Sequence, residues 1–425
     1  MDIFSDSLQQ VFASMKGAGR ALNYTWFIFL PPLLYFLFKE LWMKHIQDKF
    51  GAAPDWVVLE IIPPKNIERS PKPMESLFMG FTGAEKSFNP IELYIDGAFT
   101  DYMSLEIVGN SGSVHFYIRV MRKYQHLIEA HLYAQYPDVE IVEVPDYVDD
   151  VPKVIPNSQW DLWGSDLSFV RDNAYPIKTY PKFEESVTGK MIDPLAGLIE
   201  TMGKLGPNQQ LWIQWIIQPT KTKWAGTEGK KVVDKLKGRE EKKDGIFSQL
   251  GKDLVDVFSN LGKALFNPVE FSASESKKDE QPLEFRLSKV EQDVLKAVEE
   301  NLGKPQFYVK PRYIFLGRRE NFDKGVGISA FFGAIRQFAD DNLNSLKPNE
   351  SKTTAYHIFI EPRLRYLQRK ILRRYRGRSM DGGKIVMSTE ELATVFHLPD
   401  MNVLAPSLNR VEAKRGGAPS NLPIE

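Results

Sequence analysis

The sequence predicts the α+β class: an N-terminal transmembrane helix, two ferredoxin-like (βαββαβ) domains, the second with a helical insertion, and a C-terminal helical and linker segment. Three observations lead to this prediction. Residues 21–38 form an apolar run without a charged side chain. Residues 55–147 show the order strand, helix, strand, strand, helix, strand, which is typical of the ferredoxin-like motif. A similar order recurs over residues 157–350.

The apolar run, extended to residues 21–43, predicts a transmembrane helix because a hydrocarbon core of about 30 Å needs roughly 20 apolar residues. Trp26 and Trp42 stand toward its two ends, where indole rings favour the headgroup region. A secretory signal peptide fits less well, because no small-residue cleavage site follows the run. The preceding residues 1–20 are expected to form an amphipathic or disordered tail.

Charge and cysteine content indicate the expected location, which is the cell (inner) membrane, crossed once, with the bulk of the chain cytoplasmic. Lys39, Lys44 and Lys49 follow the run, against Lys16 and Arg20 before it, which is a small bias toward a cytoplasmic C-terminal side. The chain has no cysteine, so no disulfide would hold an exported domain together. Its 55 basic and 55 acidic residues balance, so net charge alone indicates no partner.

The first domain is expected over residues 55–147. It begins with an apolar strand at 56–64, and a helix follows. Alternating apolar residues over 102–120, with a turn at the centre, predict a β-hairpin with one buried face. A helix at 124–136 and a strand at 139–144 complete the order.

The second domain is expected over residues 157–350, with an insertion at 219–287. Its predicted elements are strands at 167–170, 177–180, 211–217 and 307–316 and helices at 193–205, 288–302 and 327–338. The insertion opens with a lysine-rich leader and continues with apolar residues at helical spacing. Such a segment docks on a membrane surface or a neighbouring subunit, or it packs on its own domain, and the sequence leaves both open.

Sequences that resemble catalytic motifs fail on physical grounds. Residues 197–205 resemble a P-loop, but Leu205 stands where a hydroxyl must reach Mg²⁺. Residues 325–330 match a dinucleotide fingerprint without the βαβ unit that must frame it. The six histidines show no metal-ligand spacing. We therefore predict no catalytic, cofactor-binding or metal-binding residue and no enzymatic activity. A membrane enzyme without a recognisable motif is the third hypothesis.

A basic helix is expected within residues 351–387. Eight cationic side chains lie within sixteen residues: Arg363, Arg365, Arg369, Lys370, Arg373, Arg374, Arg376 and Arg378. The planar guanidinium group suits phosphate oxygens, so the sequence indicates contact with nucleic acid or with lipid headgroups. The alternative is that these cations pair with the acidic segment at 138–152 or with carboxylates of a partner.

The final segment, residues 388–425, combines a short helix with a linker-like tail. Ser388 and Glu391 have the spacing of a capping box, which predicts that a helix begins at this point. Pro399 ends that helix, and prolines and glycines dominate the residues beyond it.

These C-terminal residues carry a resemblance to a known family. The RRYRGRS sequence at 373–379, the capping-box helix at 388–400 and the PSNLP sequence at 419–423 resemble the segment just upstream of the motor domain in bacterial conjugation and type IV secretion ATPases. A membrane span followed by paired α+β domains is similar to the N-terminal half of those coupling-protein-like proteins. In such proteins a RecA-like ATPase begins soon after this point, whereas this sequence ends at Glu425.

The resemblance implies a membrane-anchored, non-catalytic subunit of a type IV secretion or conjugation-like translocation machine, a scaffold that docks and assembles a separately encoded ATPase. The implied partners are a P-loop motor ATPase in trans, membrane lipid and DNA, within an oligomer, and no cofactor is expected. The implied docking residues are Glu391, Leu392, Phe396, His397, Pro399, Asn421, Leu422 and Pro423. The alternative is a membrane-tethered nucleic-acid or anionic-lipid binding protein that acts through Arg363 to Arg378.

Overall fold

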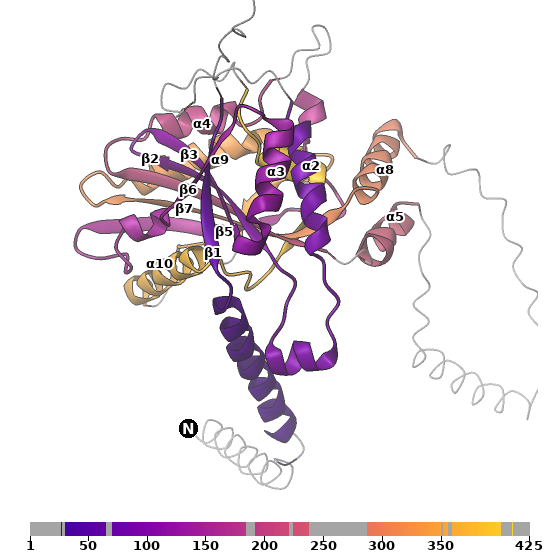
Figure 1. Ribbon diagram of the computed structural model, residues 1–425, viewed down its shortest axis with the longest axis horizontal. Helices are drawn as coiled ribbons and strands as arrows, with labels where there is room; N and C mark the ends of the chain where they lie inside the picture. The colour runs from indigo at the N-terminus through magenta and orange to yellow at the C-terminus, as the bar shows by residue number, and fades with distance from the viewer. Residues whose placement is uncertain are drawn as a thin grey trace, which may run out of the picture. The chain divides into compact units, whose positions relative to one another are not determined.

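The computed structural model describes residues 27, 30–64, 70–183, 192–220, 224–237, 287–349, 352–355, 359–400 and 410. The chain divides into two compact units (Figure 1). The first unit comprises Met1–Trp56 and Lys86–Asp101, and the second comprises Val57–Glu85 and Tyr102–Glu425.

The first unit consists of a helix at residues 30–52 and a segment that contains the short π-helix η2 (Glu92–Asp96). The indole Nε1 of Trp42 donates a hydrogen bond of 2.9 Å to the carbonyl oxygen of Tyr94. Gly97 has φ +70°, and a Cβ at this position would lie 2.5 Å from the helix backbone. Glycine therefore allows the segment to turn directly against the helix.

The prediction of a transmembrane helix at 21–43 is wrong. No helix among the described residues is long and apolar enough to cross a bilayer. In the helix at 30–52, Lys39 and Glu40 end the apolar stretch, and Lys44 follows about one turn later. The predictions of a membrane protein and of a single-pass location in the inner membrane depended on that helix, and they are wrong with it. Residues 1–26, 28 and 29, which include the predicted tail, lie outside the described residues.

The described part of the second unit is built on a nine-stranded sheet with the order β4-β1-β3-β2-β6-β7-β5-β8, while β9 pairs with β7. The strands are β1 (Trp56–Ile62), β2 (Met103–Asn110), β3 (Ser113–Met121), β4 (Glu140–Val144), β5 (Trp160–Phe169), β6 (Gln209–Pro219), β7 (Gln306–Arg318), β8 (Leu346–Pro348) and β9 (Ile385–Ser388). The prediction of an α+β protein is therefore confirmed.

The sheet contains two halves with the same internal order. The first half runs β1, α2, β2, β3, α3, β4, and the second runs β5, α4, β6, β7, α9, β8. In each half the strands lie in the order fourth, first, third, second. The helices are α2 (Lys72–Phe81), α3 (Gln125–Gln135), α4 (Ala196–Gly203) and α9 (Lys324–Ile335), with α5 (Lys230–Leu236) and α8 (Lys289–Leu302) between β6 and β7. Residues 221–223 and 238–286 of the expected insertion lie outside the described residues.

The two halves join through antiparallel pairing of β2 with β6, which runs in register from Met103 opposite Ile217 to Asn110 opposite Gln210. One sheet and one apolar cluster therefore extend through both halves.

The strand expected at 177–180 is not formed. The backbone N–H of Ile177 instead donates to the Glu391 carboxylate at 3.0 Å, and that of Tyr180 donates to the Thr394 hydroxyl at 2.9 Å. Both acceptors belong to helix α11 (Thr389–Val395). Side chains of α11 thus take the place of a neighbouring strand.

The two faces of the sheet are covered differently. One face, the helical face, packs against α2, α3, α4, α9 and α11. The other face packs against helix α10 (Ile360–Arg376) and the short 3-10 helix η4 (Tyr147–Asp150), and we call it the α10 face. Each fully buried large apolar side chain contributes roughly 1.5–3 kcal/mol, so both clusters stabilise the sheet. The position of α10 on the second face is what creates the candidate site.

Candidate nucleic-acid interface

The composition of α10 explains why it is helical and basic. Its 17 residues are mostly leucine, arginine and other good helix formers, and Glu361 is the acidic residue of the first turn. Arg373, Arg374 and Arg376 occupy the last turn, where cations interact favourably with the helix dipole.

The inner face of α10 is fixed to the sheet by hydrogen bonds as well as by apolar contacts. Gln368 donates from Nε2 to the Asp161 carboxylate and to the Leu162 carbonyl oxygen, both at 2.8 Å. The Tyr375 ring packs on Trp212 with centroids 5.3 Å apart, so a rigid helix presents the outer residues.

A row of polar side chains lies beneath α10. Glu106, Gln214, Arg312 and Asp166 stand directly opposite one another on β2, β6, β7 and β5, and each is at most 1% exposed. Gln214 Nε2 donates to Glu106 at 2.9 Å, and Arg312 Nη1 donates to Gln214 Oε1 at 3.0 Å. Arg312 Nε donates to Asp166 at 2.6 Å. Neighbours in the row therefore satisfy part of one another's hydrogen-bonding groups, and Arg312 also donates to the carbonyl oxygens of Arg374 and Ser379.

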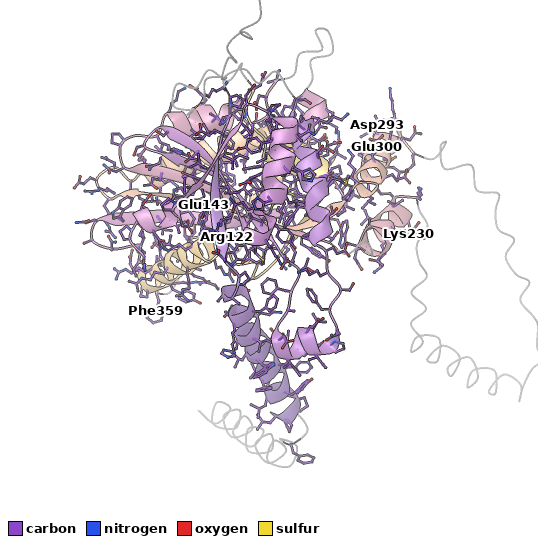
Figure 2. The ribbon with its side chains drawn as sticks, viewed as in Figure 1. Arg122, Glu143, Lys230, Asp293, Glu300 and Phe359 are labelled. Atoms are coloured by element: carbon purple, nitrogen blue, oxygen red, sulfur yellow. The ribbon has the colours of Figure 1, made fainter. Side chains whose placement is uncertain are left out.

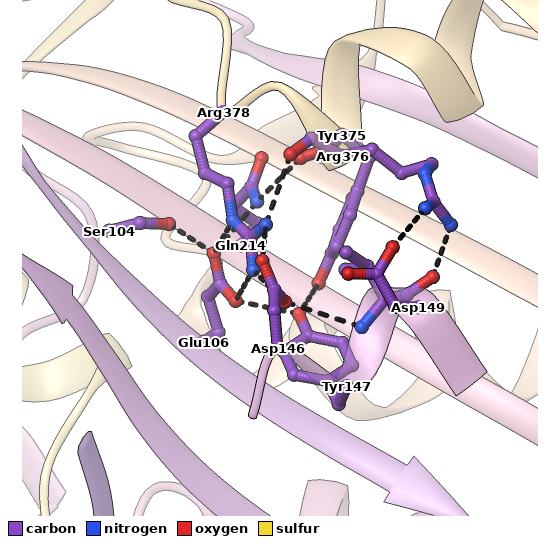
Figure 3. A network of polar contacts seen from close by, with 10 residues as sticks. Ser104, Glu106, Asp146, Tyr147, Asp149, Gln214, Tyr375, Arg376 and Arg378 are labelled. Atoms are coloured by element: carbon purple, nitrogen blue, oxygen red, sulfur yellow. Dashed lines mark hydrogen bonds and ion pairs between the residues drawn. The ribbon is translucent and has the colours of Figure 1, made fainter. Parts of the chain in front are cut away.

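Arg378, just after α10, pairs with this row (Figure 3). Its Nε and Nη2 each donate to one carboxylate oxygen of Glu106 at 3.0 Å, and Nη2 also donates to Asp146 at 2.8 Å. Burial raises the pKa of Glu106, but the charge and the hydrogen bonds of Arg378 outweigh burial and lower this pKa to about 2. A charged, bidentate pair thus fixes the end of α10.

Arg376 makes a second link at the same end. Its Nη2 donates to the Asp149 carboxylate at 2.6 Å, and its Nη1 donates to the carbonyl oxygen of Val148 (Figure 3). Asp146 and Asp149 belong to the acidic segment at 138–152. Arg376 and Arg378 therefore follow the second interpretation of the basic segment, in which its cations pair with these carboxylates.

The other predicted cations lie elsewhere. Arg374 is partly buried, and its Nη1 lies 3.5 Å from the Asp166 carboxylate. The remaining cations are exposed or half-buried on the outer side of α10: Arg363, Arg365, Arg369, Lys370 and Arg373.

Two aromatic side chains share this outer side. Phe359, labelled in Figure 2, is 78% exposed and Tyr366 is 59% exposed. With spacings of three, four and three residues, one face of α10 carries Arg363, Tyr366, Lys370 and Arg373, and the exposed N-cap residue Phe359, with φ +58°, precedes them. We call these five residues the cationic–aromatic stripe. Lys370 Nζ lies 5.6 Å from the centroid of the Tyr366 ring, which is a cation–π contact within the stripe.

Comparison with known proteins places the chain in a family. Residues 45–410 match the family described as Domain of unknown function (DUF8128). The chain belongs to the DUF8128 family. A search of curated proteins found no match. The family description assigns no function, so the resemblance to conjugation and type IV secretion ATPases stays a prediction.

The docking residues implied by that resemblance are buried in the protein interior wherever the structure describes them. Glu391, Leu392, Phe396, His397 and Pro399 are all buried. Glu391 completes the predicted capping box. His397 Nε2 lies 3.1 Å from the carboxylate of the buried Asp193. These residues therefore support the fold of α11. Asn421, Leu422 and Pro423 lie outside the described residues.

Sequence reasoning missed the buried row beneath α10. Glu106, Gln214 and Arg312 each interrupt a strand that is otherwise largely apolar, and each lies on the same face of its strand as an apolar residue two positions away. A charged residue in such a position is the sequence feature that could have indicated a buried polar network, because an isolated charge is costly to bury.

Proposed function

We propose that this protein binds single-stranded nucleic acid along the cationic–aromatic stripe of α10. The observation that supports this proposal is the alternation of exposed aromatic and cationic side chains along one face of a fixed helix. Stacking of a base on an aromatic side chain contributes about 1–3 kcal/mol, and it does not depend on base identity. Guanidinium groups bind the phosphates that separate the bases.

The cations of the stripe are available for phosphates. Glu361 is the acidic residue within α10, and its carboxylate lies 3.8 Å from Arg365, which is outside the stripe. An exposed ion pair of this kind contributes only about 0–1 kcal/mol to stability, so a phosphate can replace Glu361 as the partner of Arg365.

Anchoring of α10 lowers the cost of binding. Its inner face is hydrogen-bonded to β5, and Arg376 and Arg378 hold its C-terminal end. Because the helix backbone is already ordered, binding must order only the side chains of the stripe. The helical part of the stripe, from Arg363 to Arg373, extends over about 15 Å of helix.

The test is fluorescence anisotropy with a labelled single-stranded oligonucleotide at 50–200 mM salt. The variant Arg363→Glu/Arg369→Glu/Arg373→Glu reverses two cations of the stripe and the exposed Arg369 beside it. It is expected to bind at least about 100-fold more weakly and to show a salt slope smaller by about 2, because about three phosphate contacts are lost. Tyr366→Ala is expected to weaken binding about 5- to 100-fold with an unchanged slope, because stacking releases no counterions.

The matched control is Lys230→Glu/Lys289→Glu/Lys296→Glu, which changes net charge equally at exposed positions of α5 and α8. This control is expected to retain most of the binding. Equal weakening by both triple variants would contradict the proposal. Binding to vesicles of anionic lipid without binding to oligonucleotides would also contradict it.

A further inference from the structure

A pocket of about 830 Å³ lies in the second half of the sheet, beside the cationic–aromatic stripe. Helix α10 forms one wall, strands β5 and β7 form the floor, and Lys347 and Pro348 of β8, with Asn349 and Lys352, form the rim. The pocket lining includes Asp166, Lys310, Lys347, Leu367, Lys370 and Arg374.

The described lining is strongly cationic, with five basic side chains and one carboxylate. That carboxylate, Asp166, already lies 3.0 Å from Lys310 Nζ and 3.5 Å from Arg374 Nη1. Beneath the floor, Arg312 Nε donates to it at 2.6 Å. Three cations thus share one carboxylate, and like charges in a poorly solvated site repel strongly.

Lys310 shows the effect of this crowding. It is 1% exposed, and its ammonium group donates to the Gly383 carbonyl oxygen at 2.8 Å. Burial lowers the pKa of Lys310, and the nearby charges of Arg312 and Arg374 lower it further, against the opposing effect of Asp166. A bound anion would favour the charged lysine and relieve the repulsion among the three cations.

We propose that this pocket binds a phosphomonoester dianion. The cluster around Asp166 carries two more positive charges than negative ones, which a dianion balances and a monocarboxylate does not. Lys347 and Lys370 add cations at the opening, and Leu367 supplies an apolar wall for the organic part of the ligand. A volume of this size matches pockets for small molecules, about 300–1,000 Å³.

Two sources can supply this chemistry. One is a free phosphorylated metabolite such as a nucleoside monophosphate. The other is the terminal phosphate of a nucleic-acid strand. This second source rests on the proposed function, because Lys370 belongs to both the stripe and the pocket. The charge balance of the pocket itself is independent of the proposed function.

The experiment is isothermal titration of the full chain with inorganic phosphate and with AMP, followed by 5′-phosphorylated and 5′-hydroxyl forms of one oligonucleotide. Phosphate and AMP are expected to bind, and Lys347→Ala and Lys370→Ala are each expected to weaken that binding about tenfold, because each removes a charge-assisted contact. Lys289→Ala on α8 is the matched control and should leave binding unchanged.

The oligonucleotide arms distinguish the two sources. About tenfold tighter binding of the 5′-phosphorylated strand, abolished by Lys347→Ala, indicates a strand end. Equal binding of the two strands, together with binding of AMP, indicates a free metabolite. The variant Arg363→Glu/Arg369→Glu/Arg373→Glu should retain AMP binding, so failure of the stripe and failure of the pocket are separable. The proposal would be overturned if phosphate, AMP and the 5′-phosphorylated strand did not bind. It would also be overturned if Lys347→Ala and Lys370→Ala left their binding unchanged.

Discussion

Glu106 and Asp166 show how differently two buried carboxylates can be compensated. Glu106 meets a single bidentate guanidinium, which is shared with Asp146 at the surface side. Asp166 meets three cations at once. The first arrangement is balanced within the chain and supports the fold. The second carries an excess of positive charge and suits a ligand.

The Glu106 pair makes stability depend on acid pH. Its pKa is about 2 in the folded protein against an ordinary value of 4.5, so the unfolded chain binds more protons between these values. Stability is therefore expected to fall as the pH is lowered from about 4.5 toward 2, by on the order of 3 kcal/mol from this residue. Urea unfolding at pH 5, 4 and 3 measures the slope.

Glu106→Gln is expected to flatten that slope, although it also lowers stability near neutral pH because Arg378 loses a charged partner. Glu140→Gln, at an exposed position on β4, is the control and should keep the original slope. An unchanged slope in Glu106→Gln would show that this residue does not determine the acid response.

At the scale of elements, the sequence predicts a helix start well only where a capping box marks it, and the helix expected at 327–338 instead runs from Lys324 to Ile335. The spacing of Ser388 and Glu391 predicts the capping box of α11, and the structure confirms it because the interaction is local. The sequence does not predict which arginines of the basic segment are exposed and which form ion pairs. The sequence places Arg373 and Arg376 on one basic segment, but only the fold decides that the first is exposed and the second meets Asp149.

Removal of the α11 cap has a measurable cost. Ser388→Ala is expected to lower the free energy of unfolding by about 1–2 kcal/mol, because the N–H of Glu391 loses its acceptor in a fully buried site. Ser288→Ala removes the same kind of cap from the exposed start of α8 and is expected to cost less, about 0.5 kcal/mol. Urea titration compares them, and equal effects would contradict the role assigned to burial.

At the scale of the whole second unit, the sequence indicates the repeated order of elements but not how the repeats meet. Alternation and turn residues are local features, whereas β2 and β6 are about a hundred residues apart. The alternation over 102–120 predicts one buried face, but β2 is buried on both faces along nearly its whole length, as is typical of a central strand. The prediction of a membrane helix at 21–43 fails because that span includes the charges at 39 and 40, beyond which it counts three more apolar residues.

A shared sheet predicts that the two halves unfold together. Amide protection in β3 and in β7 is expected to be lost at the same urea concentration, because both strands belong to one sheet and one apolar cluster. Ile213→Ala at the β2–β6 junction should lower both midpoints by an amount equivalent to about 2–5 kcal/mol. Val290→Ala, at an exposed position on α8, should change neither. Hydrogen exchange measures both strands, and two separate transitions would contradict this prediction.

The row beneath α10 also gives the molecule a direction. If two identical copies of one half were joined edge to edge, the row would have the same residues on both sides of the junction. A single helix could then lie across the row in two opposite orientations. Tyr117 of β3 lies opposite Glu106 and extends the row at that end. Across β3, β2, β6 and β7 the residues are therefore Tyr117, Glu106, Gln214 and Arg312, which differ on the two sides of the β2–β6 junction. The two halves of one chain can differ in this way, whereas two identical chains cannot. The unequal row gives α10 a single orientation on the sheet, with its C-terminal end beside Glu106, the carboxylate that Arg378 binds.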